Sequence, residues 1–131
     1  EEKYPGRIVM LAYVTLGSND KDKAVEFYDA VMGELGGQRV FANDRLQFYG
    51  TGPGQPMIAI GGPYDGEAAS AGNGVMPALG CKDNETVDRA YKKALEMGGT
   101  CEGEPGQRLP NFYGAYFRDP DGNKLNAFTM V

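Results

Sequence analysis

Apolar residues recur at helical spacing in two stretches of the chain. The first, residues 21–35, follows Asp20, a typical N-cap residue, and its apolar positions are Ala24, Phe27, Tyr28 and Val31. The second, about residues 84–97, precedes Gly98, a typical C-cap, and its apolar positions are Val87, Ala90, Tyr91, Ala94 and Leu95. The pattern predicts two amphipathic helices, each packed on a sheet.

Segments typical of β-strands follow each helix and are separated by turn residues. Those after the first helix are residues 38–41, 46–49 and 57–61, and those after the second are 100–102, 113–117 and 124–130. A further β-like run precedes each helix. Each half of the chain is therefore predicted to have the order β-α-β-β-β.

An internal repeat relates the two halves. The run Leu16-Gly-Ser-Asn-Asp20 returns 63 residues later as Leu79-Gly-Cys-Lys-Asp83. We predict an α+β fold in a single domain over residues 1–131, with a first module at 8–62, a linker at 63–74 and a second module at 75–131. The hairpin turns align Met57-Ile-Ala-Ile60 with Leu125-Asn-Ala-Phe128.

Composition and charge exclude several classes of function. The net charge is -5 and the longest basic cluster is Lys92-Lys93, so we expect no nucleic-acid partner. No apolar run reaches the roughly 20 residues that span a bilayer, so we expect no membrane partner and a cytoplasmic location. The chain has no histidine, and we interpret its two cysteines as reduced packing residues.

The run Ala115-Tyr-Phe-Arg-Asp-Pro-Asp-Gly-Asn-Lys-Leu125, together with Glu26-Phe-Tyr28 and Gly72-Asn-Gly74, resembles the vicinal oxygen chelate superfamily. This superfamily includes glyoxalase I, bleomycin-resistance proteins and extradiol dioxygenases, and the chain looks most like its small lactoylglutathione-lyase-like members. The resemblance implies two βαβββ modules in a cupped mixed eight-stranded sheet, often in a homodimer. In the enzymes the cup holds a divalent metal on ligands, commonly His and Glu, from the first and last strands of each module.

Carried over to this chain, the four metal-ligand positions fall on Tyr13, Ile58, Met76 and Asn126. A phenol, an aliphatic chain, a thioether and an amide do not hold zinc, nickel, manganese or iron with useful affinity. We therefore predict no metal site and no cofactor.

Strand alternation places Tyr13, Met76 and Asn126 on a common cavity face, where Tyr49, Tyr113 and Tyr116 could also contribute, although alternation leaves the facing of these three undetermined. Arg108, between two prolines in a segment expected to be flexible, could meet an anionic group or be a solvated loop residue. The cavity side chains could equally fill a collapsed cavity.

Three hypotheses follow for function. The first is a metal-free protein that binds a small planar or aromatic molecule in the cup, and the second is a metal-independent lyase or isomerase with Tyr13 and Asn126 as polar groups. The third is a dimeric interaction protein with a vestigial cavity. Nucleophilic catalysis has little support, because Cys81 should point toward a helix and no histidine could activate it.

Overall fold

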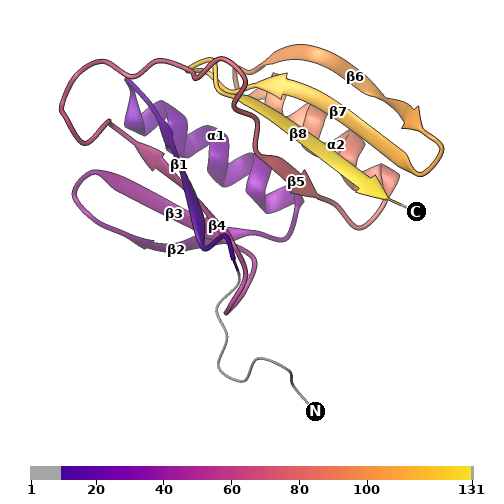
Figure 1. Ribbon diagram of the computed structural model, residues 1–131, viewed down its shortest axis with the longest axis horizontal. Helices are drawn as coiled ribbons and strands as arrows, with labels where there is room; N and C mark the ends of the chain where they lie inside the picture. The colour runs from indigo at the N-terminus through magenta and orange to yellow at the C-terminus, as the bar shows by residue number, and fades with distance from the viewer. Residues whose placement is uncertain (1–9, 131) are drawn as a thin grey trace.

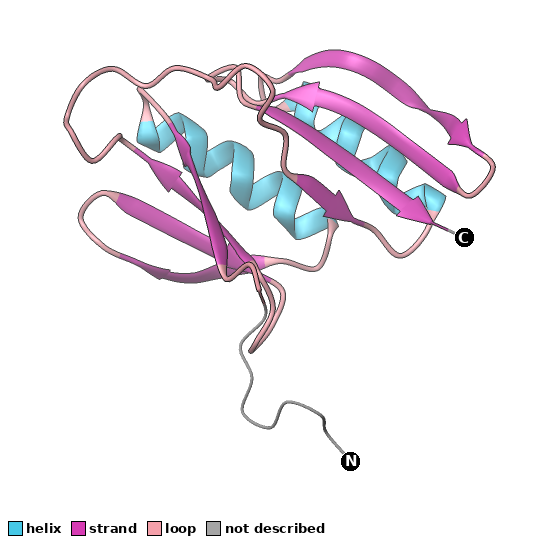
Figure 2. Ribbon diagram, viewed as in Figure 1, coloured by secondary structure: helices cyan, strands magenta, loops and turns pink. Residues whose placement is uncertain are grey.

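The computed structural model describes residues 10–130, so the predicted start of the first module at residue 8 lies outside it. Ten elements follow one another in two β-α-β-β-β halves (Figures 1 and 2). The first half contains β1 (Tyr13–Gly17), α1 (Lys21–Glu34), β2 (Gln38–Ala42), β3 (Leu46–Gly50) and β4 (Met57–Gly61). The second half contains β5 (Ala78–Gly80), α2 (Asn84–Glu96), β6 (Thr100–Leu109), β7 (Phe112–Arg118) and β8 (Lys124–Met130).

Both helices begin at the predicted caps. The Asp20 carboxylate accepts a hydrogen bond from the Lys23 backbone N–H at 3.2 Å, and the Asp83 carboxylate accepts one from the Thr86 N–H at 2.8 Å. Each cap satisfies a backbone donor that the first helical turn leaves without an intrahelical partner. Neither helix is long and apolar enough to cross a membrane, as far as the chain is described.

The strands form two mixed four-stranded sheets. Sheet A has the order β1-β4-β3-β2 and sheet B has the order β5-β8-β7-β6, with β1 parallel to β4 and β5 parallel to β8. The other neighbouring pairs are antiparallel. The predicted α+β fold of two βαβββ modules is confirmed. The eight strands of the described residues form two four-stranded sheets, with β1 and β5 at their edges, so the single cupped eight-stranded sheet that the resemblance implied is not formed within one chain.

The two modules pack through their helices (Figure 1). One core cluster includes Phe27 and Val31 of α1 and Ala90 and Ala94 of α2, all fully buried. Each helix also covers one face of its own sheet. We call the other face, which no helix covers, the outer face of that sheet. Within residues 10–130, the helix-to-helix packing leaves both outer faces without a covering helix.

Strand β6 is longer than the sequence indicated. Its pairing with β7 continues past Glu102 to Leu109, with register shifts around Gly103 and Gly106. Such bulges accommodate the glycines and Pro105 that made this segment look like a flexible loop. Arg108 therefore lies on a strand rather than in a mobile loop.

Candidate functional site

Aromatic side chains cover the outer face of sheet A. The ring of Phe48 on β3 meets Tyr13 of β1 edge to face at a centroid distance of 5.1 Å, and Phe41 of β2 stacks on it at 4.3 Å. Tyr13 is 50% exposed and Phe41 is 51% exposed. Aromatic rings that remain half exposed offer faces and edges to a flat ligand.

The predicted position Ile58 does not lie on this face. In β4, Ile58 pairs with Val14 and Tyr49 on the helix side, whereas Ala59 pairs with Thr15 and Phe48.

In the second module Asn126 pairs with Ala78, which follows Thr15 by 63 residues in the repeat. The residue equivalent to Asn126 is therefore Ala59, and the alignment of Ile58 with Asn126 was wrong by one residue. A shift of one residue moves a side chain to the other face of a sheet.

The outer face of sheet B carries Asn126 and an aromatic pair. Asn126 is 1% exposed, and its amide nitrogen donates to the Ala115 carbonyl at 3.0 Å and the Ala127 carbonyl at 3.3 Å. Phe112 and Phe128 stack at a centroid distance of 5.1 Å. Because both of its amide hydrogens are bonded within the sheet, Asn126 forms part of the buried base of this face and has no N–H left to donate to a ligand.

Tyr116 also lies on the outer face of sheet B, since it pairs with Asn126 across β7 and β8. The guanidinium carbon of Arg108 lies 5.5 Å from the centre of the Tyr116 ring, and the Lys124 ammonium lies 5.7 Å from it. Met76, just before β5, is partly exposed and lines a hollow together with Lys124 and Arg118. The structure thus brings Arg108, Met76 and Asn126 to the same face.

Tyr49 and Tyr113 face the helices instead. The Tyr49 hydroxyl donates to Asp29 of α1 at 2.8 Å, and the Tyr113 hydroxyl donates to Asp88 of α2 at 2.7 Å. Burial and the Asp29 hydrogen bond raise the pKa of Tyr49, and the Asp88 hydrogen bond raises the pKa of Tyr113. Both phenols are therefore held neutral as donors to helix carboxylates, away from the outer faces.

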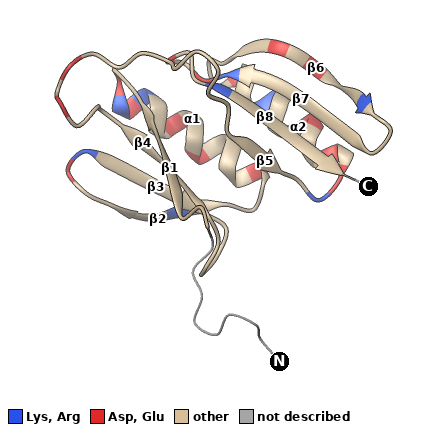
Figure 3. Ribbon diagram, viewed as in Figure 1, with Lys and Arg blue, Asp and Glu red and all other residues tan. Residues whose placement is uncertain are grey.

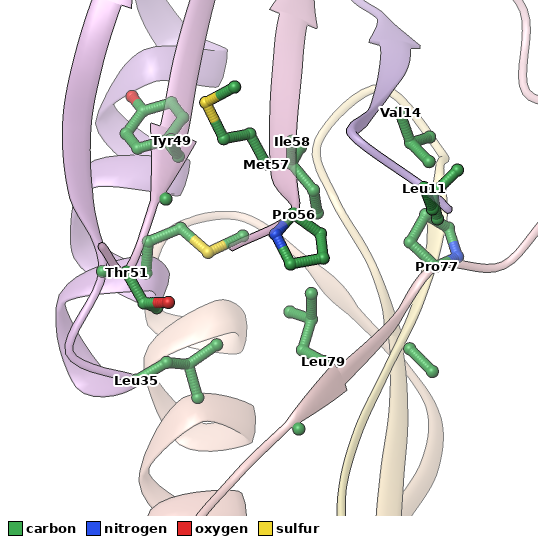
Figure 4. A pocket seen from close by; sticks show the side chains of 15 residues that line it. Leu11, Val14, Leu35, Tyr49, Thr51, Pro56, Met57, Ile58, Pro77 and Leu79 are labelled. Carbon is green, nitrogen blue, oxygen red and sulfur yellow. The ribbon is translucent and has the colours of Figure 1, made fainter. Parts of the chain in front are cut away.

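A separate apolar crevice lies between β4 and β5 at the junction of the two sheets (Figure 4). Its volume is about 300 Å³, and Ile58 and Tyr49 line it together with Leu35, Leu79 and Pro56. The Tyr49 hydroxyl is already bonded to α1, which leaves the crevice few polar groups. It could accept an apolar group but has little with which to orient one.

The corrected set of positions does not fit a metal ion. Tyr13, Ala59, Met76 and Asn126 bring a phenol, a methyl group, a thioether and a neutral amide. Residues 10–130 also contain no group of three or more Cys, Asp or Glu side chains placed to hold an ion. Catalytic divalent metals are held by imidazole and carboxylate ligands, which this set lacks.

The cysteines differ from each other. Cys81 packs against the core, as expected, and burial raises the pKa of its thiol to about 11. A thiol of this kind is a poor nucleophile near neutral pH. Cys101, by contrast, is exposed, so the expectation that both cysteines serve in packing was wrong for Cys101.

One known family and several solved structures match most of the chain. A sequence profile described as the glyoxalase/bleomycin resistance protein/dioxygenase superfamily matches residues 10–127. A glyoxalase/bleomycin resistance protein from Albidiferax ferrireducens T118 is 37% identical, with a TM-score of 0.85 over 93% of this chain and 99% of that one. The hypothetical protein SA1046 from S. aureus is 27% identical, with a TM-score of 0.69 over 95% of both chains.

A glyoxalase-related enzyme from Fulvimarina pelagi, 20% identical over 93% of this chain and 88% of that one, shares the fold with a TM-score of 0.74. No curated protein matches the sequence.

Proposed function

Since the chain belongs to the glyoxalase/bleomycin resistance protein/dioxygenase superfamily, we propose that it binds a small planar or aromatic molecule on the outer faces of its sheets, without a bound metal ion. The observation that carries the proposal is the aromatic cluster on sheet A, in which Tyr13 and Phe41 are half exposed and pack on the buried ring of Phe48. Single exposed apolar residues are common, but a contiguous aromatic face is typical of a binding surface.

The composition of both faces supports a binding role. Sheet A offers ring edges and faces, and sheet B offers the stacked Phe112 and Phe128 beside Tyr116. Ligand sites are predominantly apolar and aromatic, with a few polar groups that orient the ligand. The donor set at Tyr13, Ala59, Met76 and Asn126 supports binding by stacking and hydrogen bonding rather than by metal coordination.

We further propose that a second copy of the chain completes the site. Helix α1 packs on α2, so the two outer faces of one chain are not closed over each other. Among residues 10–130, strands β1 and β5 each leave an edge without a strand partner. A homodimer that set sheet A of one copy beside sheet B of the other would cover both edges and enclose a cavity between aromatic faces.

A ligand-observed NMR screen tests the proposal. EDTA-treated protein would be mixed with flat aromatic compounds of one and two rings, and hits would be repeated with Tyr13→Leu. We expect Tyr13→Leu to lower the affinity for the compounds that bind, because it removes a ring from the outer face of sheet A. The matched control is Tyr64→Leu, which removes a tyrosine that is 90% exposed outside both sheets.

If Tyr13→Leu and Tyr64→Leu lowered the affinity for a compound equally, its binding site would lie elsewhere, and the proposal would be contradicted. An absence of hits across the aromatic compounds would also contradict it.

A further inference from the structure

Three basic residues lie on the three strands β6, β7 and β8 of sheet B (Figure 3). Arg118 on β7 and Lys124 on β8 are at one end of the sheet, whereas Arg108 is near the other end of β6, and its guanidinium reaches back along the strand to Tyr116. Arg118 pairs with Lys124 across the sheet, and both Arg108 and Lys124 lie against the Tyr116 ring. This concentration of positive charge stands out in a chain with a net charge of -5.

Within residues 10–130 only one of the three cations forms an ion pair. Arg118 forms an ion pair with Glu102 at 3.2 Å and donates to the Gly122 carbonyl at 2.8 Å. No ion pair in the described chain involves Arg108 or Lys124. Arg108 is held by the backbone carbonyl of Glu104 instead. Two positive charges on this face therefore remain for a counter-ion from outside the chain.

Two glycines make room for the Arg108 guanidinium. A Cβ on Gly106 would lie 2.7 Å from Arg108 Nη1, and a Cβ on Gly103 would lie 3.2 Å from Arg108 Nη2. The guanidinium thus lies close along the β6 backbone, next to Tyr116. A side chain at either position would have to displace it, so its placement depends on the local sequence as well as on the arginine itself.

A hollow of about 480 Å³ adjoins the cluster, between linker residues 71–76 and the side chains of Arg118 and Lys124. From Lys124 the outward positions of β8 continue with Asn126 and Phe128. At about 3.3 Å per residue this row is about 13 Å long, the scale of a one- or two-ring molecule with a polar end. Lys124 lies at one end of the row, the stacked rings of Phe112 and Phe128 lie at the other, and the Arg108 guanidinium lies between them at Tyr116.

We infer that the ligand is an aromatic organic acid whose carboxylate or phosphate group lies between Arg108 and Lys124. This inference rests on the proposed function, because it assigns a ligand class to the same face. The strands of sheet A contain no Asp or Glu, so sheet A of a second copy would not supply the counter-ion from its strands. Arginine and lysine together suit either acid group, since both form charge-assisted hydrogen bonds with such oxygens.

Isothermal titration with four probes tests the inference: 2-naphthoate, 2-naphthyl phosphate, neutral 2-naphthamide and inorganic phosphate. We expect at least one of the two aromatic acids to bind, and 2-naphthamide to bind at least about tenfold more weakly, as the loss of a charge-assisted hydrogen bond predicts. Whichever aromatic acid binds more tightly identifies the preferred acid group.

Variants locate the acid site. Arg108→Gln and Lys124→Gln should each lower the affinity for the tighter-binding aromatic acid by about tenfold. Gly106→Ala should also lower this affinity, because it displaces the Arg108 guanidinium while keeping its charge. Lys92→Gln is the matched control, because it removes an exposed charge from α2 on the helix side. Equal weakening by Lys92→Gln would mean that only net charge matters and would overturn the inference.

The remaining outcomes separate this inference from the proposed function. Equal affinity for 2-naphthoate and 2-naphthamide would overturn the acid site while leaving aromatic binding in place. Inorganic phosphate as tight as 2-naphthyl phosphate would support the acid site and contradict a role for the aromatic faces. Binding of none of the four probes would overturn the acid site, while the wider screen with Tyr13→Leu would still decide the proposed function.

Discussion

A single buried carboxylate joins the two modules at the residue scale. Asp119, in the turn between β7 and β8, accepts hydrogen bonds from the Tyr28 hydroxyl at 2.7 Å and from the Asn123 amide at 2.9 Å. The same Asn123 amide nitrogen donates to the Gly17 carbonyl at the end of β1. Burial, followed by the neighbouring Asp119, raises the pKa of Tyr28 well above its usual range. The Asp-Pro-Asp-Gly turn therefore also connects the modules.

Removing the Tyr28 hydroxyl should destabilise the protein. We expect Tyr28→Phe to lower the free energy of unfolding by about 1.5 to 3 kcal/mol, the usual contribution of a hydrogen bond to a charged group. Urea denaturation at pH 7 measures this change. The control is Tyr113→Phe, which removes a similar bond to Asp88 at an exposed site and should cost less. Equal losses in the two variants would contradict a special role for the buried bond.

The same hydroxyl should contribute to the alkaline stability profile. Its pKa is higher in the folded state than the ordinary value near 10, so folded Tyr28 holds its proton more tightly than the unfolded chain does. This contribution is complete below pH 10 and declines as the pH rises above it. The midpoint of urea denaturation should therefore fall less in Tyr28→Phe than in the wild type between about pH 9.5 and 11, while an identical fall would contradict the assignment.

At the element scale, the sequence predicted most helices and strands but not every strand face. The helix caps and the apolar stripes carry a clear period, and β8 matches its predicted bounds at residues 124–130. Strand β4 reads Met-Ile-Ala-Ile, which is apolar on both faces and shows no alternation that would set its register. The facing of Ile58 could therefore be determined only from its pairing with Val14 and Tyr49.

The corrected register leads to a prediction for two neighbouring residues. Ile58→Ala should lower the free energy of unfolding by about 2 to 4 kcal/mol, because it leaves a cavity in the core, and should not change binding on the outer face. Met57→Ala, at a partly exposed position next to it, should cost less stability. The two free energies of unfolding and the affinity for a screening hit measure these effects. Full stability with lost binding in Ile58→Ala would restore the original alignment.

At the scale of the whole molecule, the packing of the modules was the least predictable feature. Periodicity shows that each helix has an apolar face, but it does not say that α1 and α2 share one core. That arrangement depends on side chains from distant parts of the sequence, such as Tyr28 and Asp119. It also explains why one chain presents two separate outer faces and why we propose that two copies complete the site.

Binding should therefore depend on self-association. Sedimentation equilibrium should give twice the mass of one chain at concentrations at which a screening hit binds, and the apparent affinity should fall on dilution as dimers dissociate. A protein that is monomeric by sedimentation and binds with undiminished affinity would show that one outer face is sufficient.

The central claim is that this member of a largely metal-dependent superfamily binds its ligand without a metal. The most direct test is titration of the tightest aromatic hit into protein treated with EDTA and into protein equilibrated with Zn²⁺ or Ni²⁺, with elemental analysis of each sample. We predict the same affinity in all samples and no retained metal after dialysis. Binding that appears only with one retained ion per site would contradict the account.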